Sequence, residues 1–401
     1  MEKPDIPTED KDKNFRFPYE IMKGPAKRFT EAYGQRLEVP KEFLYITYLT
    51  ILGVVLARKV TISIEIKPQP RLYVLLLGQS ADDRKSTAIE KSCEFWRQAL
   101  ISNFGRTLPE CWGVGSAEGL ATFIKKMCPE KSLLLCYDEF KSFVSKSQIK
   151  SSVLLPAINT LFEKNRLENT VKNGINIITD VHLSFIAAST IDTYEATWSR
   201  SFTDIGFNNR LFIVPGTGER KHSLPPMVPL NEIEELIHDV KDIFEFVGDY
   251  REIGFTETAR EIYDSWYMNR STSVHAKRLD GYALRFMLLM AVNQRSKVID
   301  DVIVTDACEL MDWQLTMRET HDPIDADNQF AMMEQRIRNV LRDRGPLTER
   351  ELKQYSNATR TGLWIYTSAM QNLRKEREVA INKSDRKWFL AKRSDESDEK
   401  E

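Results

Sequence analysis

The hydrophobic pattern along the chain changes its period several times. Residues 17–58 place apolar positions at helical spacing, with Pro40 as a helix start, and predict a small helical N-terminal unit. Residues 60–66 alternate and are β-branched, which predicts a strand. Continuous apolar runs predict strands buried on both faces at 72–77, 132–137, 181–188 and 210–214. Helical patterns lie between most of these runs, so we expect an α/β fold with a mainly parallel sheet and helices on both faces.

The second half of the chain predicts two further units. Residues 215–229 are rich in glycine and proline and predict a hinge, after which 230–317 are largely helical. Residues 330–393 predict a winged helix, with a capped helix start at Thr348, a recognition helix at 359–377 and a hairpin wing at 379–390. The expected domains are a flexible arm with the helical unit (1–58), an α/β core (59–228), a helical lid (229–325), the winged helix (326–393) and an acidic disordered tail (394–401).

Composition narrows the class of protein. The chain has 401 residues, 42% hydrophobic and 29% charged, with a net charge of −2, as expected for a globular protein of two or three domains. Its 5 cysteines are widely spaced and form no metal-binding pattern, so we expect neither disulfides nor a zinc site, and a cytoplasmic location. Residues 1–13 are charged, and the longest apolar run is too short to cross a bilayer comfortably. We therefore expect no signal peptide and no membrane partner.

One segment has the strand, loop and helix order that binds phosphate groups. Its candidate residues are Gly78, Ser80, Arg84, Lys85, Ser86 and Thr87. A phosphate needs backbone N–H groups that point inward, a helix N-terminus and one mobile cation. Lys85 supplies that cation for the β- and γ-phosphates of ATP, and Ser86 is placed to bind Mg²⁺.

Three features depart from the usual phosphate loop. Arg84 stands where a glycine usually precedes the lysine, and Gly78 lies one residue further away than the standard spacing. Asp82 and Asp83 add negative charge, which is unfavourable beside a phosphate unless both side chains point outward. The alternative interpretation is a loop that only begins a helix.

A second candidate group follows the predicted strand 132–137. Asp138 and Glu139 stand where the carboxylates of an ATPase would order Mg²⁺ and polarise the attacking water, respectively. The alternative is the acidic N-cap of a helix. Because ligands of open α/β sheets bind at the carboxyl ends of the strands, we expect Lys85 and Asp138 to meet at one edge. Lys85 and Asp138 on opposite sides of the molecule would refute this hypothesis.

Several further residues have a candidate role and a structural alternative. Ser189 ends a predicted strand and is placed to contact the γ-phosphate, or to cap the next helix. Arg210 precedes the last strand and is either a finger that reaches the nucleotide of a neighbouring subunit or a surface residue. Arg278 or Arg285 is a candidate second sensor of nucleotide, although most arginines on such helices are solvated.

Two regions are candidates for binding DNA. An Asn-Gly pair between strand-like runs predicts a hairpin near residue 173, with Lys172 at its tip. The predicted winged helix carries a surplus of about eight positive charges, which could pair with phosphates. Its candidate contacts are Arg360, Arg374, Lys375, Lys383, Arg386 and Lys387. The alternatives are an ordinary hairpin within a sheet and a winged helix that binds protein.

These motifs resemble a family of P-loop, helicase-like ATPases of the AAA+ type. Phages, plasmids and integrated elements encode its members, which are often associated with primases. The resemblance covers most of residues 17–293 and rests on the opening at 17–20, the loop from Gly78 to Thr87, the segment 115–120, Asp138–Glu139 and Asn209–Arg210. The layout is also similar to the AAA+ module of minichromosome-maintenance helicases, where an Arg-Phe pair carries the finger; Leu211 replaces that Phe here.

The resemblance implies an ATP- and Mg²⁺-dependent DNA helicase or translocase that acts in the replication of a mobile element. It implies a homo-oligomeric ring, such as a hexamer, with Arg210 acting in trans, the Lys172 hairpin in the pore and a primase as a partner. Two alternatives stay open: an ATP-switched DNA-binding initiator or helicase loader without unwinding activity, and a degenerate ATPase fold with a structural role.

Overall fold

The structure is a computed structural model that describes residues 16–79, 83–149, 152–171, 174–197, 206–321, 329–382 and 384–391. The chain forms two compact units, Met1–Asp322 and Pro323–Glu401. Each unit has its own hydrophobic core.

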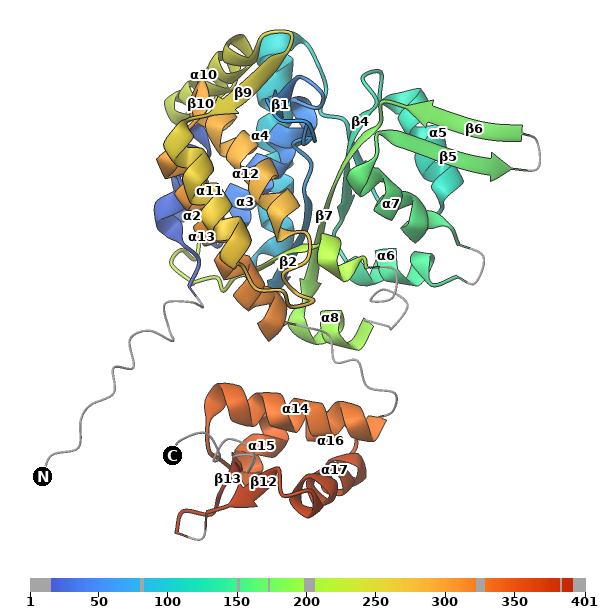
Figure 1. The fold of residues 1–401 in the computed structure, drawn as a ribbon, viewed down its shortest axis with the longest axis vertical. Helices are drawn as coiled ribbons and strands as arrows, with labels where there is room; N and C mark the ends of the chain where they lie inside the picture. Colours follow the sequence, from blue (N-terminus) through green and yellow to red (C-terminus); the bar gives the residue numbers. More distant parts are fainter. Residues whose placement is uncertain are drawn as a thin grey trace, which may run out of the picture. The chain divides into compact units, whose positions relative to one another are not determined.

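The first unit is built around a five-stranded parallel sheet (Figure 1). Its strands are β2 (Tyr73–Gly78), β3 (Glu110–Trp112), β4 (Ser132–Tyr137), β7 (His182–Thr190) and β8 (Phe212–Pro215). They lie in the order β3-β4-β7-β2-β8, and each neighbouring pair is parallel. The central strands β2, β4 and β7 are buried almost throughout, which explains their continuous apolar sequences. The predicted parallel sheet is therefore confirmed.

Helices flank this sheet on both sides (Figure 1). On one side lie α2 (Gly24–Leu37), α3 (Lys41–Val55) and α4 (Lys85–Phe104), and on the other lie α6 (Phe140–Ser147) and α7 (Leu154–Glu163). The helix α3 is buried along almost its whole length because it packs against the sheet, α2 and α4. A helix with neighbours all round has no polar face, and the sequence of α3 is accordingly apolar. As predicted, this helix begins directly after Pro40.

A second set of helices joins the same unit. It consists of α10 (Leu230–Val247), α11 (Glu257–Asn269), α12 (Leu279–Asn293) and α13 (Asp301–Thr320). A small parallel sheet links β1 (Val60–Ile62) to β9 (Arg251–Phe255) and β10 (Val298–Ile299). The strand predicted at 60–66 is therefore shorter than expected, since its pairing with β9 covers Val60–Ile62. It lies outside the main sheet, because β9 and β10 form a separate sheet with it.

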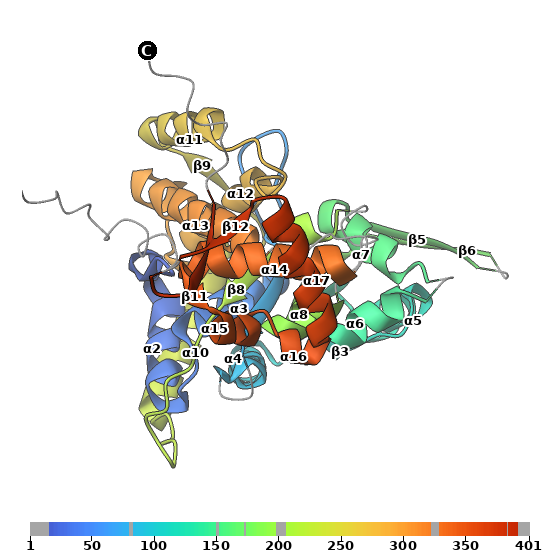
Figure 2. The same cartoon turned by 90° about the horizontal axis from the view of Figure 1, so that it is seen from below.

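The predicted hairpin is present between α7 and β7. It consists of β5 (Arg166–Val171) and β6 (Gly174–Thr179), which pair in antiparallel register. Its strands contact α5 (Ala117–Met127), and β5 also contacts α7. Figures 1 and 2 both show the two strands extending outward, away from the five-stranded sheet.

The second unit combines helices with a small antiparallel sheet. Its elements are α14 (Gln329–Arg344), β11 (Leu347–Thr348), α15 (Glu349–Tyr355), α16 (Ala358–Thr361), α17 (Leu363–Lys375), β12 (Val379–Ile381) and β13 (Lys387–Leu390). The start of α15 has the predicted cap, in which Thr348 and Glu351 bond each other's backbone N–H. The helix predicted at 359–377 is divided at Gly362, whose φ of 123° is incompatible with a continuous helix.

Candidate functional site

Lys85 and the pair Asp138–Glu139 lie at the same edge of the main sheet. The strands β2 and β4 both pair in parallel with β7, so their carboxyl ends point the same way. Lys85 begins α4 just after β2, and Asp138–Glu139 directly follow β4. Burial lowers the pKa of Lys85, while the carboxylates of Asp83 and Glu139 act to raise it. Glu139 is therefore close enough to Lys85 to affect its pKa. Lys85 and Asp138 do not lie on opposite sides of the molecule, which is the arrangement that would have refuted the nucleotide hypothesis.

A pocket opens beside the two carboxylates. It has a volume of about 600 Å³, and its lining includes Trp112, Gly115, Asp138, Glu139 and Lys146. One wall is fixed by Tyr137 at the end of β4. Its hydroxyl donates to the Val114 carbonyl (2.9 Å) and accepts from the Val114 N–H (3.0 Å). Asp138 and Glu139 are both exposed, so a ligand can reach them.

Arg84 has the backbone conformation that a glycine would adopt. Its φ of 53° and ψ of 28° lie in the left-handed region. The side chain of Arg84 bonds Glu38 (Nη2 to Oε2, 3.2 Å), and Glu38 also accepts the backbone N–H groups of Lys221 and His222. These hydrogen bonds, that of His222 first, lower the pKa of Glu38. At this one position the backbone therefore has the conformation that glycine favours, although the residue is an arginine.

Asp83 points into the protein, which sequence reasoning did not foresee. Its side chain is 3% exposed and accepts the N–H of Gln79 and the N–H of Gly218 (Oδ1, 3.0 Å). These N–H groups stabilise the negative charge of the Asp83 carboxylate, which we expected from the sequence to be unfavourable beside a phosphate. A side chain at Gly78 would place its Cβ only 2.6 Å from Asp83 Oδ2. The first glycine of the loop is therefore required by Asp83.

The hydroxyl groups predicted near the phosphates take different positions. Ser86 is exposed in the first turn of α4, and Thr87 is half-buried beside it. Ser189 is buried at the end of β7, between β2 and β4, and donates to the Thr190 carbonyl (3.0 Å). Thr190 accepts the N–H of Thr193 (3.1 Å), so the helix-cap role belongs to Thr190.

Arg210 lies at the opposite edge of the sheet from Lys85. It ends a short 3₁₀ helix just before β8, whose Phe212 pairs with Val74 near the start of β2. Since a strand rises about 3.3 Å per residue, most of the length of β2 separates this position from the end at Gly78. Arg210 therefore lies near the amino ends of the strands, whereas Lys85 follows the carboxyl end of β2.

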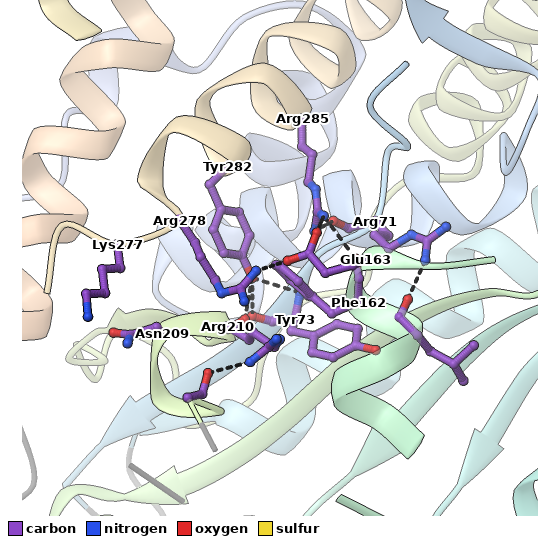
Figure 3. A network of polar contacts seen from close by, with 12 residues as sticks. Arg71, Tyr73, Phe162, Glu163, Asn209, Arg210, Lys277, Arg278, Tyr282 and Arg285 are labelled. Atoms are coloured by element: carbon purple, nitrogen blue, oxygen red, sulfur yellow. Dashed lines mark hydrogen bonds and ion pairs between the residues drawn. The ribbon is translucent and has the colours of Figure 1, made fainter. Parts of the chain in front are cut away.

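Arg210 belongs to a group of five arginines, which we call the arginine cluster; Figure 3 labels four of them, Arg71, Arg210, Arg278 and Arg285. Its members come from distant parts of the first unit: Arg71, Arg210, Arg278, Arg285 and Arg318. Arg318 donates four hydrogen bonds of 2.9–3.1 Å to the carbonyls of His275, Lys277, Asn209 and Leu211. It thereby joins the segment before Arg278 to the segment around Arg210.

The two candidate second sensors differ in accessibility. Arg285 is buried and donates to the carbonyls of Arg71 (3.1 Å) and Phe162 (3.0 Å). Burial lowers its pKa to about 10. The expectation that such an arginine is solvated is wrong for Arg285, because α12 is buried along its length. The side chain of Arg278 is 34% exposed and forms an ion pair with Glu163.

The candidate DNA contacts are only partly described. Lys172 and Lys383 lie outside the described residues, as does the side chain of Arg360. Ser80, a candidate of the phosphate loop, also lies outside them. In the second unit Arg374, Lys375 and Arg386 are exposed, and Lys387 is half-buried. The Arg374 guanidinium lies 5.5 Å from the centre of the Trp388 ring, so this tryptophan packs within the unit.

The helices and the potential metal ligands of the described residues bear on membrane and metal binding. Every helix there is too short or too polar to span a bilayer. In the same residues, no three His, Cys, Asp or Glu side chains are grouped so as to hold a metal ion by themselves. Comparison with known proteins finds no family model and no curated protein that matches this sequence.

Proposed function

We propose that the chain binds ATP with Mg²⁺ at the sheet edge where Lys85 meets Asp138–Glu139, and that it hydrolyses the nucleotide. One observation carries this proposal: β2 and β4, on either side of β7, end at the same edge and bring a lysine and two carboxylates together there. The electrostatic coupling between Lys85 and Glu139 supports it. A site with one cation and two carboxylates beside a helix N-terminus suits phosphoryl transfer.

Each residue has a distinct role in this proposal. The first N–H groups of α4 and the Lys85 ammonium bind the phosphates and offset their negative charge. Ser86 and Asp138 are exposed oxygen donors, and they fit Mg²⁺ because this ion takes one or two protein ligands and the rest from phosphates and water. The bound ion supplies further charge neutralisation. Glu139 orients the attacking water and accepts its proton, while Ser189 lies between the two strands to contact the γ-phosphate.

The arginine cluster supports action between neighbouring copies. Arg210 and Arg278 lie at the edge opposite the proposed ATP site, so they would serve the site of an adjacent subunit in an assembly. Arginine stabilises the charge of the transferred phosphoryl group in trans in many such enzymes. We therefore propose a homo-oligomer, with a closed ring as the arrangement that gives every site an Arg210.

DNA is the proposed partner of this assembly. The β5–β6 hairpin extends outward from the unit, and the exposed Arg374, Lys375 and Arg386 of the second unit could pair with DNA phosphates. With the resemblance to helicase-like ATPases of mobile elements, these features support a DNA helicase or translocase in replication. Association with a primase is the corresponding proposal for a protein partner.

The test uses two site variants and a matched control. Lys85→Ala should abolish binding of MgATP, whereas Glu139→Gln should keep binding and lose hydrolysis. Lys91→Ala is the control, because Lys91 lies on the same helix in an exposed pair with Glu94 (2.7 Å). Calorimetric titration measures binding, and phosphate release with and without DNA measures turnover. Intact turnover in Lys85→Ala would refute the proposal, and hydrolysis without strand displacement would favour an initiator or helicase loader.

A further inference from the structure

Glu163 supplies the carboxylate at the centre of the arginine cluster. It ends α7 and forms an ion pair with Arg278, while its Oε2 atom lies 3.8 Å from Arg285 Nη2 (Figure 3). The side chains of Glu163 and Arg278 are 43% and 34% exposed, respectively. An ion pair this open to solvent is weak, so another anion can replace the carboxylate.

The backbone that carries Arg278 is held firmly, although its side chain is accessible. Arg278 has a φ of 67° at the start of α12, and Arg318 bonds the carbonyls of His275 and Lys277 just before it. The hydroxyl of Tyr282, one turn further along α12, donates to the Arg210 carbonyl (2.6 Å) and accepts the N–H of Tyr73 (3.3 Å). The guanidinium of Arg278 can therefore change partner while the backbone stays in place.

Glu163 lies at a structurally sensitive place in α7. The last carbonyls of this helix are bonded by two buried arginines, Arg71 at Leu161 and Arg285 at Phe162. Arg71 also donates to the Lys164 carbonyl (3.2 Å) and to the side-chain oxygen of Asn165. Strand β5 of the hairpin begins at the next residue. Only two residues thus separate Glu163 from the base of the hairpin.

We propose that Glu163 is the resident counter-ion of Arg278, and that the phosphates of ATP bound to a neighbouring copy displace it. A triphosphate carries more charge and more acceptor oxygens than a carboxylate, so it is the stronger partner for a guanidinium. Once released, Glu163 no longer pairs with Arg278, and the end of α7 is then held to α12 through Arg285 and the Phe162 carbonyl. The nucleotide of one copy thereby alters the hairpin of the next. This inference rests on the proposed function, and it adds a positioning residue that connects the two sites.

The experiment compares Glu163→Gln with a matched control in the full chain. The control is Glu130→Gln, because Glu130 is 49% exposed and pairs with Arg106 at 2.9 Å in another part of the unit. Mass photometry measures the ATP concentration that half-assembles the protein, and phosphate release measures stimulation by DNA. Loss of an exposed ion pair should lower the half-assembly concentration about two- to fivefold, because Arg278 no longer has to leave a carboxylate. DNA stimulation should fall by a similar factor, and Glu130→Gln should match the wild type.

A double variant separates this role from a merely structural one. In an Arg278→Ala background, Glu163→Gln should cause no further change in assembly, whereas a purely structural effect of Glu163 would persist. Glu163→Asp keeps the charge and should remain near the wild type, so it tests the role of the carboxylate even if the glutamine variant folds poorly. Unchanged assembly in Glu163→Gln would overturn the inference.

Failure of the inference differs from failure of the proposed function. A wild-type chain that binds MgATP but stays monomeric overturns the role of Glu163 and leaves the Lys85 site intact. A chain that binds no MgATP overturns both.

Discussion

Asp83 offers a sharp test of how the loop between β2 and α4 keeps its shape. The buried carboxylate accepts two backbone N–H groups, from Gln79 and Gly218. A hydrogen bond to a charged group contributes about 1.5–3 kcal/mol, and the exposed Gln79 can replace its lost bond with water. We therefore expect Asp83→Ala to lower the free energy of unfolding by about 3 kcal/mol. Asp83→Asn keeps one acceptor oxygen and should cost about half as much.

The same variants distinguish two effects of Asp83 on nucleotide binding. Its charge lies close enough to Lys85 to affect the pKa of the lysine, so it also repels a triphosphate. If repulsion dominated, Asp83→Asn would bind MgATP more tightly. We expect the opposite, because in the proposed site the phosphates bind backbone N–H groups at the start of α4, next to the Asp83 contacts. A loss of about 1.4 kcal/mol corresponds to a tenfold weaker affinity.

Urea unfolding and calorimetric titration of MgATP are the two measurements. Glu94→Gln is a suitable control, because Glu94 is an exposed carboxylate on α4 that pairs with Lys91 at the surface. It should leave both quantities unchanged. Wild-type stability in Asp83→Asn together with tighter binding of MgATP would show that Asp83 only repels the ligand, and would refute this account of the loop.

Two further predictions concern the neighbouring residues. Arg84→Gly should change the free energy of unfolding by less than about 1 kcal/mol, because relief of the left-handed backbone offsets the lost contact with Glu38. Arg84→Val should lose about 1–2 kcal/mol by urea unfolding, since a β-branched residue is strained there; equal stability of the two variants would contradict this. Burial raises the pKa of Glu42 above its ordinary 4.5, so the folded protein retains a proton that the unfolded chain releases. The free energy of unfolding should therefore fall as pH rises from 4.5 through the folded pKa, and less steeply in Glu42→Gln; parallel curves for the two proteins would exclude this role.

The central strands could be predicted because burial on both faces leaves a direct mark in the sequence. The apolar runs at 72–77 and 132–137 correspond to β2 and β4 within one residue. The short strand β3 was not predicted, because three residues that include Glu110 are too few to show a pattern. The partner of β1 was also beyond sequence reasoning, since pairing with β9 depends on the packing of the whole unit.

The candidate site was predictable where its residues directly follow strands. The positions of Lys85 and Asp138 follow from strand order, because parallel strands share one carboxyl edge. The inward position of Asp83 depends on Gly218, and the pairing of Arg278 depends on Glu163, each far away in the sequence. Contacts of this kind leave no local pattern, so only the folded structure reveals them.

The unusual residues of the loop are explained together by its surroundings. A phosphate loop usually obtains its tight backbone from glycines, which tolerate left-handed conformations and close contacts. Here Arg84 adopts the left-handed conformation, and its side chain is anchored by Glu38. Asp83 packs against Gly78 and accepts the N–H of Gly218, and Glu38 accepts the N–H of Lys221. Asp83 and Glu38 therefore both contact the segment after β8. The described ends of the loop, at Gln79 and at Asp83–Arg84, are therefore held by side-chain contacts that involve this segment, and we expect a change in the segment to affect the start of α4 at Lys85.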